Sequence, residues 1–301
     1  MELWIPVTIA AAFSQNLRFM LQKHLKGLKL STAGATFARF VYSAPLVAVL
    51  MILYIRATGQ AVPEIPSVFW GYALTGGLAQ ILATMCVVAL FSRRNFAVGI
   101  TFKKTEVVQT AIVGLIVLGE AVSPWGVLAI VVGFLGVVLL SDPPAGASGQ
   151  WYRRIINPAA GLGLLSGVLF AISAIGYRGA SLSLGLTDVV MSAGVTLAIV
   201  TAFQTLTMSV WLALRERGEM LRVFQNWRVA GLVGITSMIG SFCWFTAFTL
   251  QNAAYVKALG QIELLFSFAA GVFVFKEKTS PREFMAMGLI VLSILILILV
   301  I

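Results

Sequence analysis

Charged side chains interrupt two of the most apolar stretches of this chain. The first stretch, 95–124, contains Lys103 and Glu106. The second, 252–281, contains Glu263. A charge at the centre of a lipid bilayer costs about 2.5–3.5 kcal/mol on insertion scales. If both stretches cross a membrane, each glutamate must therefore face the protein interior, be protonated or be paired with a cation.

Two interpretations of these glutamates are open. Lys103 and Glu106 are three residues apart and can meet on one face of a helix. Lys257 and Gln261 are four apart and can do the same. In the first interpretation such contacts are structural and hold the helices together. In the second, Glu106 and Glu263 line the path of a small polar molecule or change protonation as it passes.

Further polar and aromatic side chains fall inside apolar runs and could line the same interior. Trp244 is the only tryptophan predicted at the middle of a span. It either packs in the core or forms one wall of a pocket for an aromatic or amphiphilic ligand. The full candidate set is Asn16, Gln80, Lys103, Glu106, Tyr177, Trp244, Phe248, Tyr255, Lys257 and Glu263.

Other charged and capping residues are predicted to lie at the edges of the spans. Arg18 is near the end of its run, from which its long side chain can reach the membrane surface. Glu120 precedes a helix start and is expected to be exposed, and Arg178 is expected in a connection. Ser123 followed by Pro124 predicts an N-cap and a first helical residue.

The two charged stretches are copies of one another. Adding 157 to each residue number of 95–124 gives 252–281 without a gap. The matched positions share an Asn, two Glu and a Ser-Pro pair. Chance explains apolar matches between hydrophobic helices, but not this polar set in a single register. We therefore infer an internal duplication.

Composition indicates a polytopic membrane protein. Hydrophobic residues make up 59% of the chain and charged residues 11%, against about 25% charged in soluble domains. The net charge of +10 comes from residues between apolar runs, which suits anionic membrane lipid and argues against a nucleic-acid partner. Enzyme motifs and metal-ligand spacings are absent, so we expect no catalytic residues, no metal and no cofactor.

Ten apolar runs are long enough to cross a bilayer, which needs about 20 residues. The longest connection divides them into two sets of five, so the predicted domains are 1–141 and 159–301, joined by a linker at 142–158. The predicted fold is all-α. The runs are roughly 3–22, 32–55, 68–92, 95–118, 124–141, 159–180, 187–213, 229–250, 253–275 and 281–301.

The distribution of Lys and Arg predicts the orientation. Nearly all basic residues between runs fall in the odd-numbered connections, which places those connections in the cytoplasm and both termini outside. Because each half holds an odd number of spans, the halves are predicted to be inverted, related by a two-fold axis in the membrane plane.

Several stretches resemble a known family. They are FARFVYSAPLVAVLM (37–51), ALFSRRNFAVGITF (89–102), LGEAVSPWGVLAIVVGFLGVVLL (118–140) and FKEKTSPREFMAMGLIVLS (275–293). The shared pattern is a glutamate after the fourth or ninth span, then Ser-Pro, then a glycine-bearing helix. The chain resembles the drug/metabolite transporter superfamily, specifically the EamA-type ten-helix exporters, over essentially its whole length.

This resemblance implies a secondary transporter in the bacterial cytoplasmic membrane. It would export small amphiphilic metabolites, plausibly amino acids including aromatic ones, by alternating access. Spans 1, 3, 4, 6, 8 and 9 would surround a central cavity, with spans 5 and 10 outside them, and proton coupling would involve the two glutamates. The alternatives are transport of hydrophobic drugs or nucleotide sugars, and a membrane scaffold that transports nothing.

Overall fold

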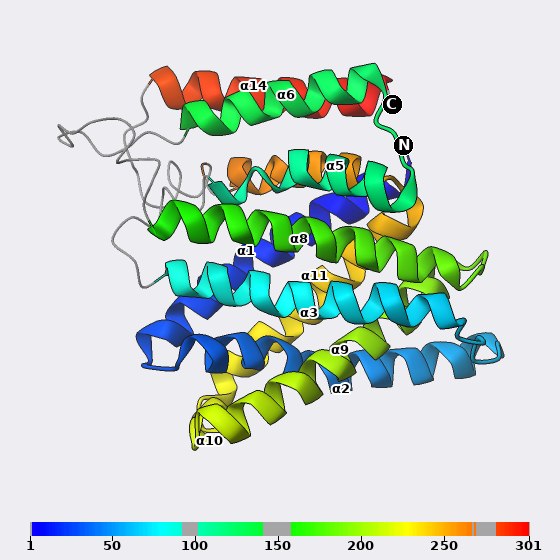
Figure 1. The fold of residues 1–301 in the computed structure, drawn as a ribbon, viewed down its shortest axis with the longest axis vertical. Helices are drawn as coiled ribbons and strands as arrows, with labels where there is room; N and C mark the ends of the chain where they lie inside the picture. The colour runs from blue at the N-terminus through cyan, green and yellow to red at the C-terminus, as the bar shows by residue number, and fades with distance from the viewer. Residues whose placement is uncertain (1, 92–101, 141–157, 267, 269–280, 301) are drawn as a thin grey trace.

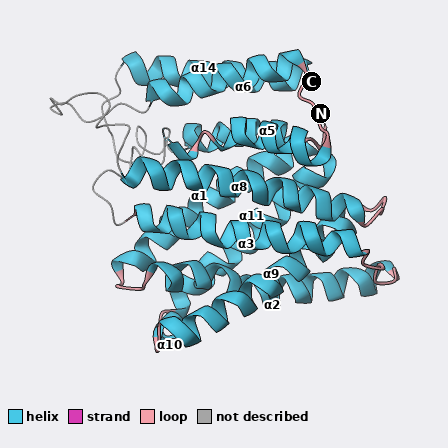
Figure 2. Cartoon of the chain, viewed as in Figure 1, coloured by secondary structure: helices cyan, strands magenta, loops and turns pink. Residues whose placement is uncertain are grey.

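The computed structural model describes residues 2–91, 102–140, 158–266, 268 and 281–300, and the regular structure within them is helical (Figure 2). The predicted linker and the residues Asn95, Glu277 and Ser280 of the copied stretches lie outside these ranges. The helices are α1 (Trp4–Gly27), α2 (Thr32–Thr58), α3 (Ser67–Leu90), α5 (Glu106–Leu118), α6 (Pro124–Leu140), α8 (Pro158–Ser183), α9 (Val189–Arg215), α10 (Glu219–Gln225), α11 (Trp227–Leu250), α12 (Ala253–Leu259), the 3-10 turn η1 (Gly260–Ile262) and α14 (Pro281–Val300).

Six helices are long and apolar enough to cross a membrane, namely α2, α3, α8, α9, α11 and α14, while α5 and α6 are shorter apolar helices. The 24-residue α1 is not one of the six, and it buries Gln15, Arg18 and Gln22 on its inner face. Large apolar side chains point outward elsewhere, as at Ile116 and Leu214, which are 76% and 74% exposed. The fold is thus that of a multi-pass membrane protein.

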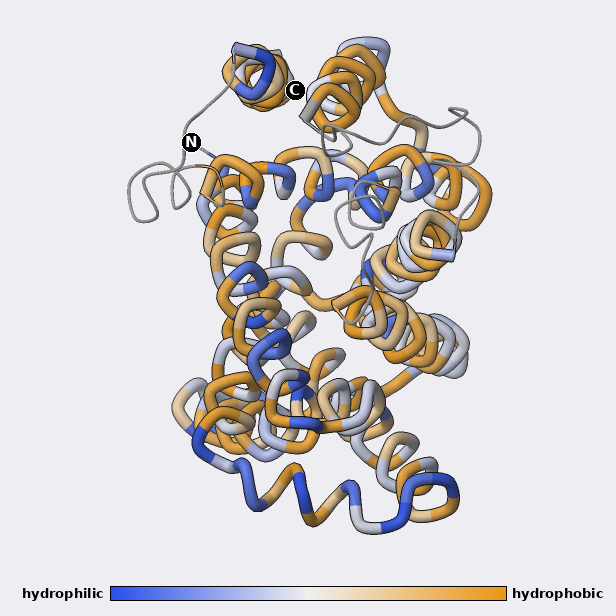
Figure 3. The backbone as a smooth tube through the Cα atoms, turned by 90° about the vertical axis from the view of Figure 1, so that its left-hand side faces the viewer, coloured by the Kyte–Doolittle hydropathy of each residue, from blue (hydrophilic) through white to orange (hydrophobic). Residues whose placement is uncertain are grey.

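The helices lie side by side, and the chain reverses direction at successive connections (Figure 1). The two chain ends lie at the same end of the bundle. In the interior, α3 packs on α8, α1 on α11, and α2 on both α9 and α11. The pair α6 and α14 forms one edge of the molecule, and α10 lies at the opposite edge, where hydrophilic residues gather (Figure 3).

The two charged stretches are not continuous helices, contrary to the expectation for 95–118 and 253–275. Residues Lys104 and Thr105 form a turn before α5 begins at Glu106. The Thr105 backbone N–H and hydroxyl both donate to the Phe102 carbonyl, at 3.2 Å and 2.6 Å, so this turn has the hydrogen-bond spacing of a 3-10 helix. At the corresponding place α12 gives way to η1 directly before Glu263. Each glutamate therefore follows a break in its helix.

Helix starts follow from side-chain caps. The Ser123 hydroxyl accepts from the Gly126 backbone N–H at 3.1 Å, and α6 begins at Pro124, which confirms the predicted cap. The Ser31 hydroxyl caps α2 in the same way. Asp188 caps α9 and also accepts from the Tyr54 hydroxyl at 2.7 Å. That hydrogen bond holds the pKa of the Asp188 carboxyl below its usual range.

Candidate functional site

Five charged side chains from the two copied stretches lie together beside these turns. The Lys103 ammonium lies 3.5 Å from Glu106 Oε1, and the Lys257 ammonium lies 3.9 Å from the same atom. Lys104 forms an ion pair with Glu263. Each buried carboxylate therefore contacts a lysine supplied by the other copied stretch.

Helix α1 adds a hydrogen bond to the Lys104–Glu263 ion pair. Gln15 of α1 donates from Nε2 to Glu263 Oε2 at 2.9 Å, and both side chains are buried. Removing one partner of a buried ion pair typically costs about 3–5 kcal/mol, because the other charge is left without compensation. Loss of Glu263 would therefore remove the contacts of both Gln15 and Lys104 and leave the buried Lys104 without its carboxylate.

Aromatic rings surround the lysines. The Lys257 ammonium lies 4.8 Å from the centroid of Trp244 and 5.6 Å from that of Phe248. Lys103 and Lys257 share the Phe170 ring, at 5.2 Å and 5.6 Å from its centroid. The electron-rich faces of these rings stabilise cations that have lost their water. The site thus combines basic groups with flat apolar surface.

Two buried arginines join this cluster. Arg39 of α2 donates from Nη1 to the Thr84 hydroxyl at 2.9 Å and from Nη2 to Ser241 at 3.4 Å. Arg18 of α1 is only 3% exposed, and its guanidinium lies 4.6 Å from the centroid of Phe19. The expectation that Arg18 reaches the membrane surface is therefore wrong, because its side chain turns into the bundle.

A small enclosed cavity of about 20 Å³ lies among α1, α2, α3, α8, α11 and α12. That volume holds a single water molecule, whereas ligand pockets measure about 300–1,000 Å³. A metabolite can enter only if the surrounding helices move apart. The lining consists of Gln15, Arg39, Gln80, Phe170, Ser173, Ala174, Tyr177, Ser241, Trp244, Phe245, Phe248 and Lys257.

The candidate residues from the sequence divide into three groups in the structure. Those that line the cavity are Gln80, Tyr177, Trp244, Phe248 and Lys257. Lys103, Glu106 and Glu263 lie beside it in the ion-pair cluster. Asn16 and Tyr255 are not part of the lining.

Tyr255 connects α12 to the start of α6 instead. Its hydroxyl accepts from the Ser123 backbone N–H at 2.8 Å. Its ring also lies so close to Gly126 that an added Cβ would come within 2.4 Å of it. This contact fixes α12 against the peripheral helix pair, which explains why the ring is directed away from the cavity.

Sequence reasoning missed several lining residues. Arg39 was the most predictable of them, because it is a basic residue inside an apolar run. Sequence spacing alone, however, does not show which face of α2 points to the interior. Gln15, Ser173 and Ser241 gave a weaker signal, because hydroxyl and amide groups also occur on lipid-facing helices. A hydrogen-bond network positions two of the lining residues from α9: Gln204 donates from Nε2 to the Gln80 side chain at 2.9 Å and to the Tyr177 hydroxyl at 3.2 Å.

An arginine links several elements near the end of the bundle where the termini lie. Arg178 donates from Nε to both carboxylate oxygens of Glu120, at 2.7 Å and 2.8 Å. Its Nη1 donates to the Phe248 and Gln251 carbonyls. Arg178 therefore belongs to α8 and Glu120 is partly buried, which corrects their expected places in a connection and at the surface. Together they link α8, α11 and the α5–α6 connection.

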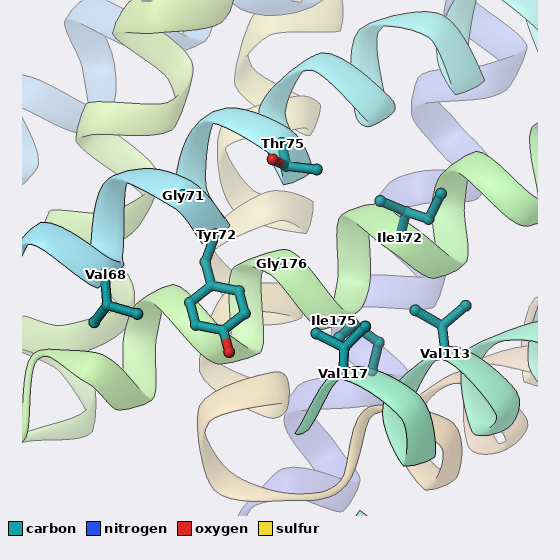
Figure 4. A pocket seen from close by; sticks show the side chains of 9 residues that line it. All are labelled: Val68, Gly71, Tyr72, Thr75, Val113, Val117, Ile172, Ile175 and Gly176. Atoms are coloured by element: carbon teal, nitrogen blue, oxygen red, sulfur yellow. The ribbon is translucent and has the colours of Figure 1, made fainter. Parts of the chain in front are cut away.

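A larger groove of about 330 Å³ lies between α3, α5 and α8 (Figure 4). Its lining is apolar, and Val68 and Val117 are exposed, so it opens on the outer surface of the bundle. It contains no charged side chain among its lining residues, which are Val68, Gly71, Tyr72, Thr75, Val113, Val117, Ile172, Ile175 and Gly176. The polar candidate site is the enclosed cavity.

A solved crystal structure is similar to this fold, with a TM-score of 0.66 over 97% of this chain and 99% of its own. At 17% sequence identity, the likeness concerns the fold alone. No curated protein sequence matches this chain. Within the described residues, no group of three or more His, Cys, Asp or Glu side chains could hold a metal ion.

The family assignment comes from the first half of the sequence. Residues 2–142 match the family model of the EamA-like transporters. This match places the protein in the drug/metabolite transporter superfamily. Its apolar helices are those of a multi-pass membrane protein, and the matched family is one of transporters.

Proposed function

We propose that this protein is a secondary transporter that exports small amphiphilic metabolites across the bacterial cytoplasmic membrane. Amino acids, including aromatic ones, are the substrates to test first. The observation that carries the proposal is the buried cavity, which joins flat aromatic rings to hydrogen-bonding and charged groups and is closed in this structure.

An inverted duplication into 1–141 and 159–301 supports alternating access. Adding 157 to the bounds of α2 (Thr32–Thr58) gives the bounds of α9 (Val189–Arg215). Helix packing follows the same correspondence: α1 packs on α11 and its counterpart α8 packs on α3, while α6 packs on its own counterpart α14. Two such halves can rock about a fixed central site, as inverted-repeat transporters do.

The two ends of the bundle provide contacts that this rocking would break and remake. At the end that carries the termini, Arg178 links the halves through Glu120. At the opposite end, the Ser31 backbone N–H donates to Glu219 at 2.5 Å, which ties the α1–α2 connection to α10. We place the terminus-bearing end outside the cell, because the basic connections then face the cytoplasm.

The buried carboxylates are the groups we assign to proton coupling. Glu106 contacts two lysines and Glu263 contacts one. A change in the protonation of either would alter the balance of charge around the cavity, and so would bias the two halves toward one orientation. Coupling of this kind needs no metal or organic cofactor.

Uptake into liposomes containing the purified protein tests the function. We expect saturable flux of at least one amino acid, with phenylalanine and tryptophan as the first labelled substrates, and faster flux under an imposed pH gradient. Empty liposomes are the control. Absence of saturable flux for every amino acid would contradict the proposal.

A second candidate function is favoured by the basic residues. Arg39 and Lys257 line the cavity, whereas no carboxylate of the described residues does. This excess of positive charge suits anionic substrates such as nucleotide sugars better than cationic hydrophobic drugs. Uptake of a labelled nucleotide sugar, measured beside uptake of labelled phenylalanine, separates this candidate from amino-acid export. A scaffold without transport activity would show uptake of neither.

A further inference from the structure

The buried charges around the cavity do not balance. Among the described residues, the basic side chains there are Arg18, Arg39, Lys103, Lys104 and Lys257, against the carboxylates Glu106 and Glu263. With all seven ionised, the net charge is +3. The remaining buried carboxylate, Glu219, lies on α10 at one end of the bundle and accepts from the Ser31 backbone. It does not compensate the cavity.

Among the described side chains that line the cavity, the polar atoms left without partners are donors, whereas outside the lining Glu106 Oε2 and Gln204 Oε1 are acceptors without partners. Of the side chains that line it, Arg39 Nε and the Trp244 indole N–H are buried and make no hydrogen bond among the described residues. Arg18, which shares the Phe19 ring with Lys103, has two more such atoms, Nε and Nη2. A buried unsatisfied donor costs about 1–3 kcal/mol, and more when it is charged. These groups require an acceptor.

The aromatic surface beside these donors is flat. Trp244 and Phe248 are stacked, with centroids 5.6 Å apart and planes 21° apart. Tyr177 and Phe245 form a second stack, at 4.1 Å and 26°. Both stacks line the cavity. When the helices separate, a planar apolar group can lie against these rings while a charged group reaches the donors.

We propose that the substrate is an organic anion with a planar apolar body. Its anionic group, a carboxylate or a phosphate, binds Arg39, the Trp244 indole N–H and Lys257, and its body lies on the aromatic stacks. The guanidinium of Arg18 adds positive charge beside the site. Arginine suits this role because its planar fork matches the oxygens of both anionic groups. This inference rests on the proposed function, and it narrows the substrate class by charge.

Four probes that share one phenyl ring test the charge preference. 3-Phenylpropionate carries only a carboxylate, phenyl phosphate only a phosphate, phenethylamine only an ammonium, and phenylalanine carries both a carboxylate and an ammonium. Binding to the purified full-length protein is measured by calorimetry, and transport by uptake of each labelled probe into liposomes.

We expect 3-phenylpropionate or phenyl phosphate to bind at least about tenfold more tightly than phenethylamine, because one charge-assisted hydrogen bond contributes about 1.5–3 kcal/mol. The stronger of the two anions identifies the anionic group. Equal or tighter binding of phenethylamine would overturn the inference, and so would failure of all four probes to bind. Anion binding without flux of any probe would support the anion site and contradict the transport function.

Variants locate the site. Arg39→Gln should weaken anion binding by about tenfold or more and should not weaken phenethylamine binding, because it removes a positive charge from the site. Arg215→Gln, on an exposed residue at the end of α9 beside Trp211, is the matched control and should bind anions normally. Arg39→Lys keeps the charge and guards against misfolding: it should retain part of the affinity that Arg39→Gln loses. Unchanged anion affinity in a folded Arg39→Gln would place the anion elsewhere.

Discussion

At the scale of single residues, sequence spacing predicts only some of the ion pairs that the buried charged side chains form. The predicted contact between Lys103 and Glu106 is confirmed, at 3.5 Å. Lys257, expected near Gln261, contacts Glu106 from the other copied stretch instead. Glu106 therefore balances two lysines at once, and the structure makes its carboxylate the centre of the cluster.

This arrangement separates the structural role of Glu106 from its functional role. Glu106→Gln leaves two buried lysines without a carboxylate, so we expect it to lower the free energy of unfolding by about 3–5 kcal/mol. Glu106→Gln combined with Lys103→Met removes one of those lysines and should recover part of that loss. Thermal unfolding in detergent measures both variants, and Glu64→Gln, on an exposed residue, is the control.

Transport by the same variants tests the functional role. If Glu106 takes part in coupling, the double variant remains inactive in liposomes although it is more stable than the single variant. If the double variant transports phenylalanine normally under a pH gradient, Glu106 is a structural residue and the proposed coupling through it is wrong.

At the scale of elements, small residues allow the inner helices to approach closely. An added Cβ on Gly176 of α8 would lie 2.8 Å from the Tyr72 carbonyl and 2.9 Å from the Gly76 Cα, both backbone atoms of α3. Backbone cannot move aside as a flexible side chain can. The spacing of α3 and α8, which bear Gln80 and Tyr177, is therefore set at this crossing.

Two glycines of α8, Gly176 and Gly161, should respond differently to substitution by alanine. Gly176→Ala pushes α3 and α8 apart, so we expect a loss of about 1–3 kcal/mol in the free energy of unfolding. Gly161→Ala, also in α8, meets no atom within 4 Å and should be neutral or slightly stabilising. Thermal unfolding of both variants decides between them. Equal stability of the two would show that the crossing is not closely packed.

At the scale of the whole molecule, the chain ends share one end of the bundle, and the basic connections predict which side of the membrane that is. The α2–α3 connection lies at the terminus-bearing end, and the α9–α10 connection lies at the other (Figure 1). Gln60 belongs to the first connection and Arg217 to the second. The proposed topology therefore places Gln60 outside the cell and Arg217 in the cytoplasm.

Labelling of single cysteines tests this topology in intact cells. With Cys86 and Cys243 replaced by serine, a membrane-impermeant thiol reagent should modify Gln60→Cys and leave Arg217→Cys unmodified until the cells are opened. Leu28→Cys, in the α1–α2 connection at the same end of the bundle as the α9–α10 connection, should behave as Arg217→Cys does. Modification of Gln60→Cys and Arg217→Cys from the same side would contradict a structure that crosses the membrane between them.

The sequence by itself determined the membrane character, the helical fold and the presence of polar groups among the spans. These follow from hydropathy and local spacing, which act over a few residues and need no knowledge of neighbours. The Ser123–Pro124 cap and the Lys103–Glu106 contact were predictable for the same reason.

Only the tertiary structure decided which helix faces meet, because lipid and protein interior are both apolar and a hydrophobic pattern does not distinguish them. For that reason Arg18 and Arg39 emerged as buried cations, and Tyr255 proved to fix α12 against α6 rather than line the cavity. The breaks before Glu106 and Glu263 were also missed, because they depend on local hydrogen bonds and on packing around a charged centre.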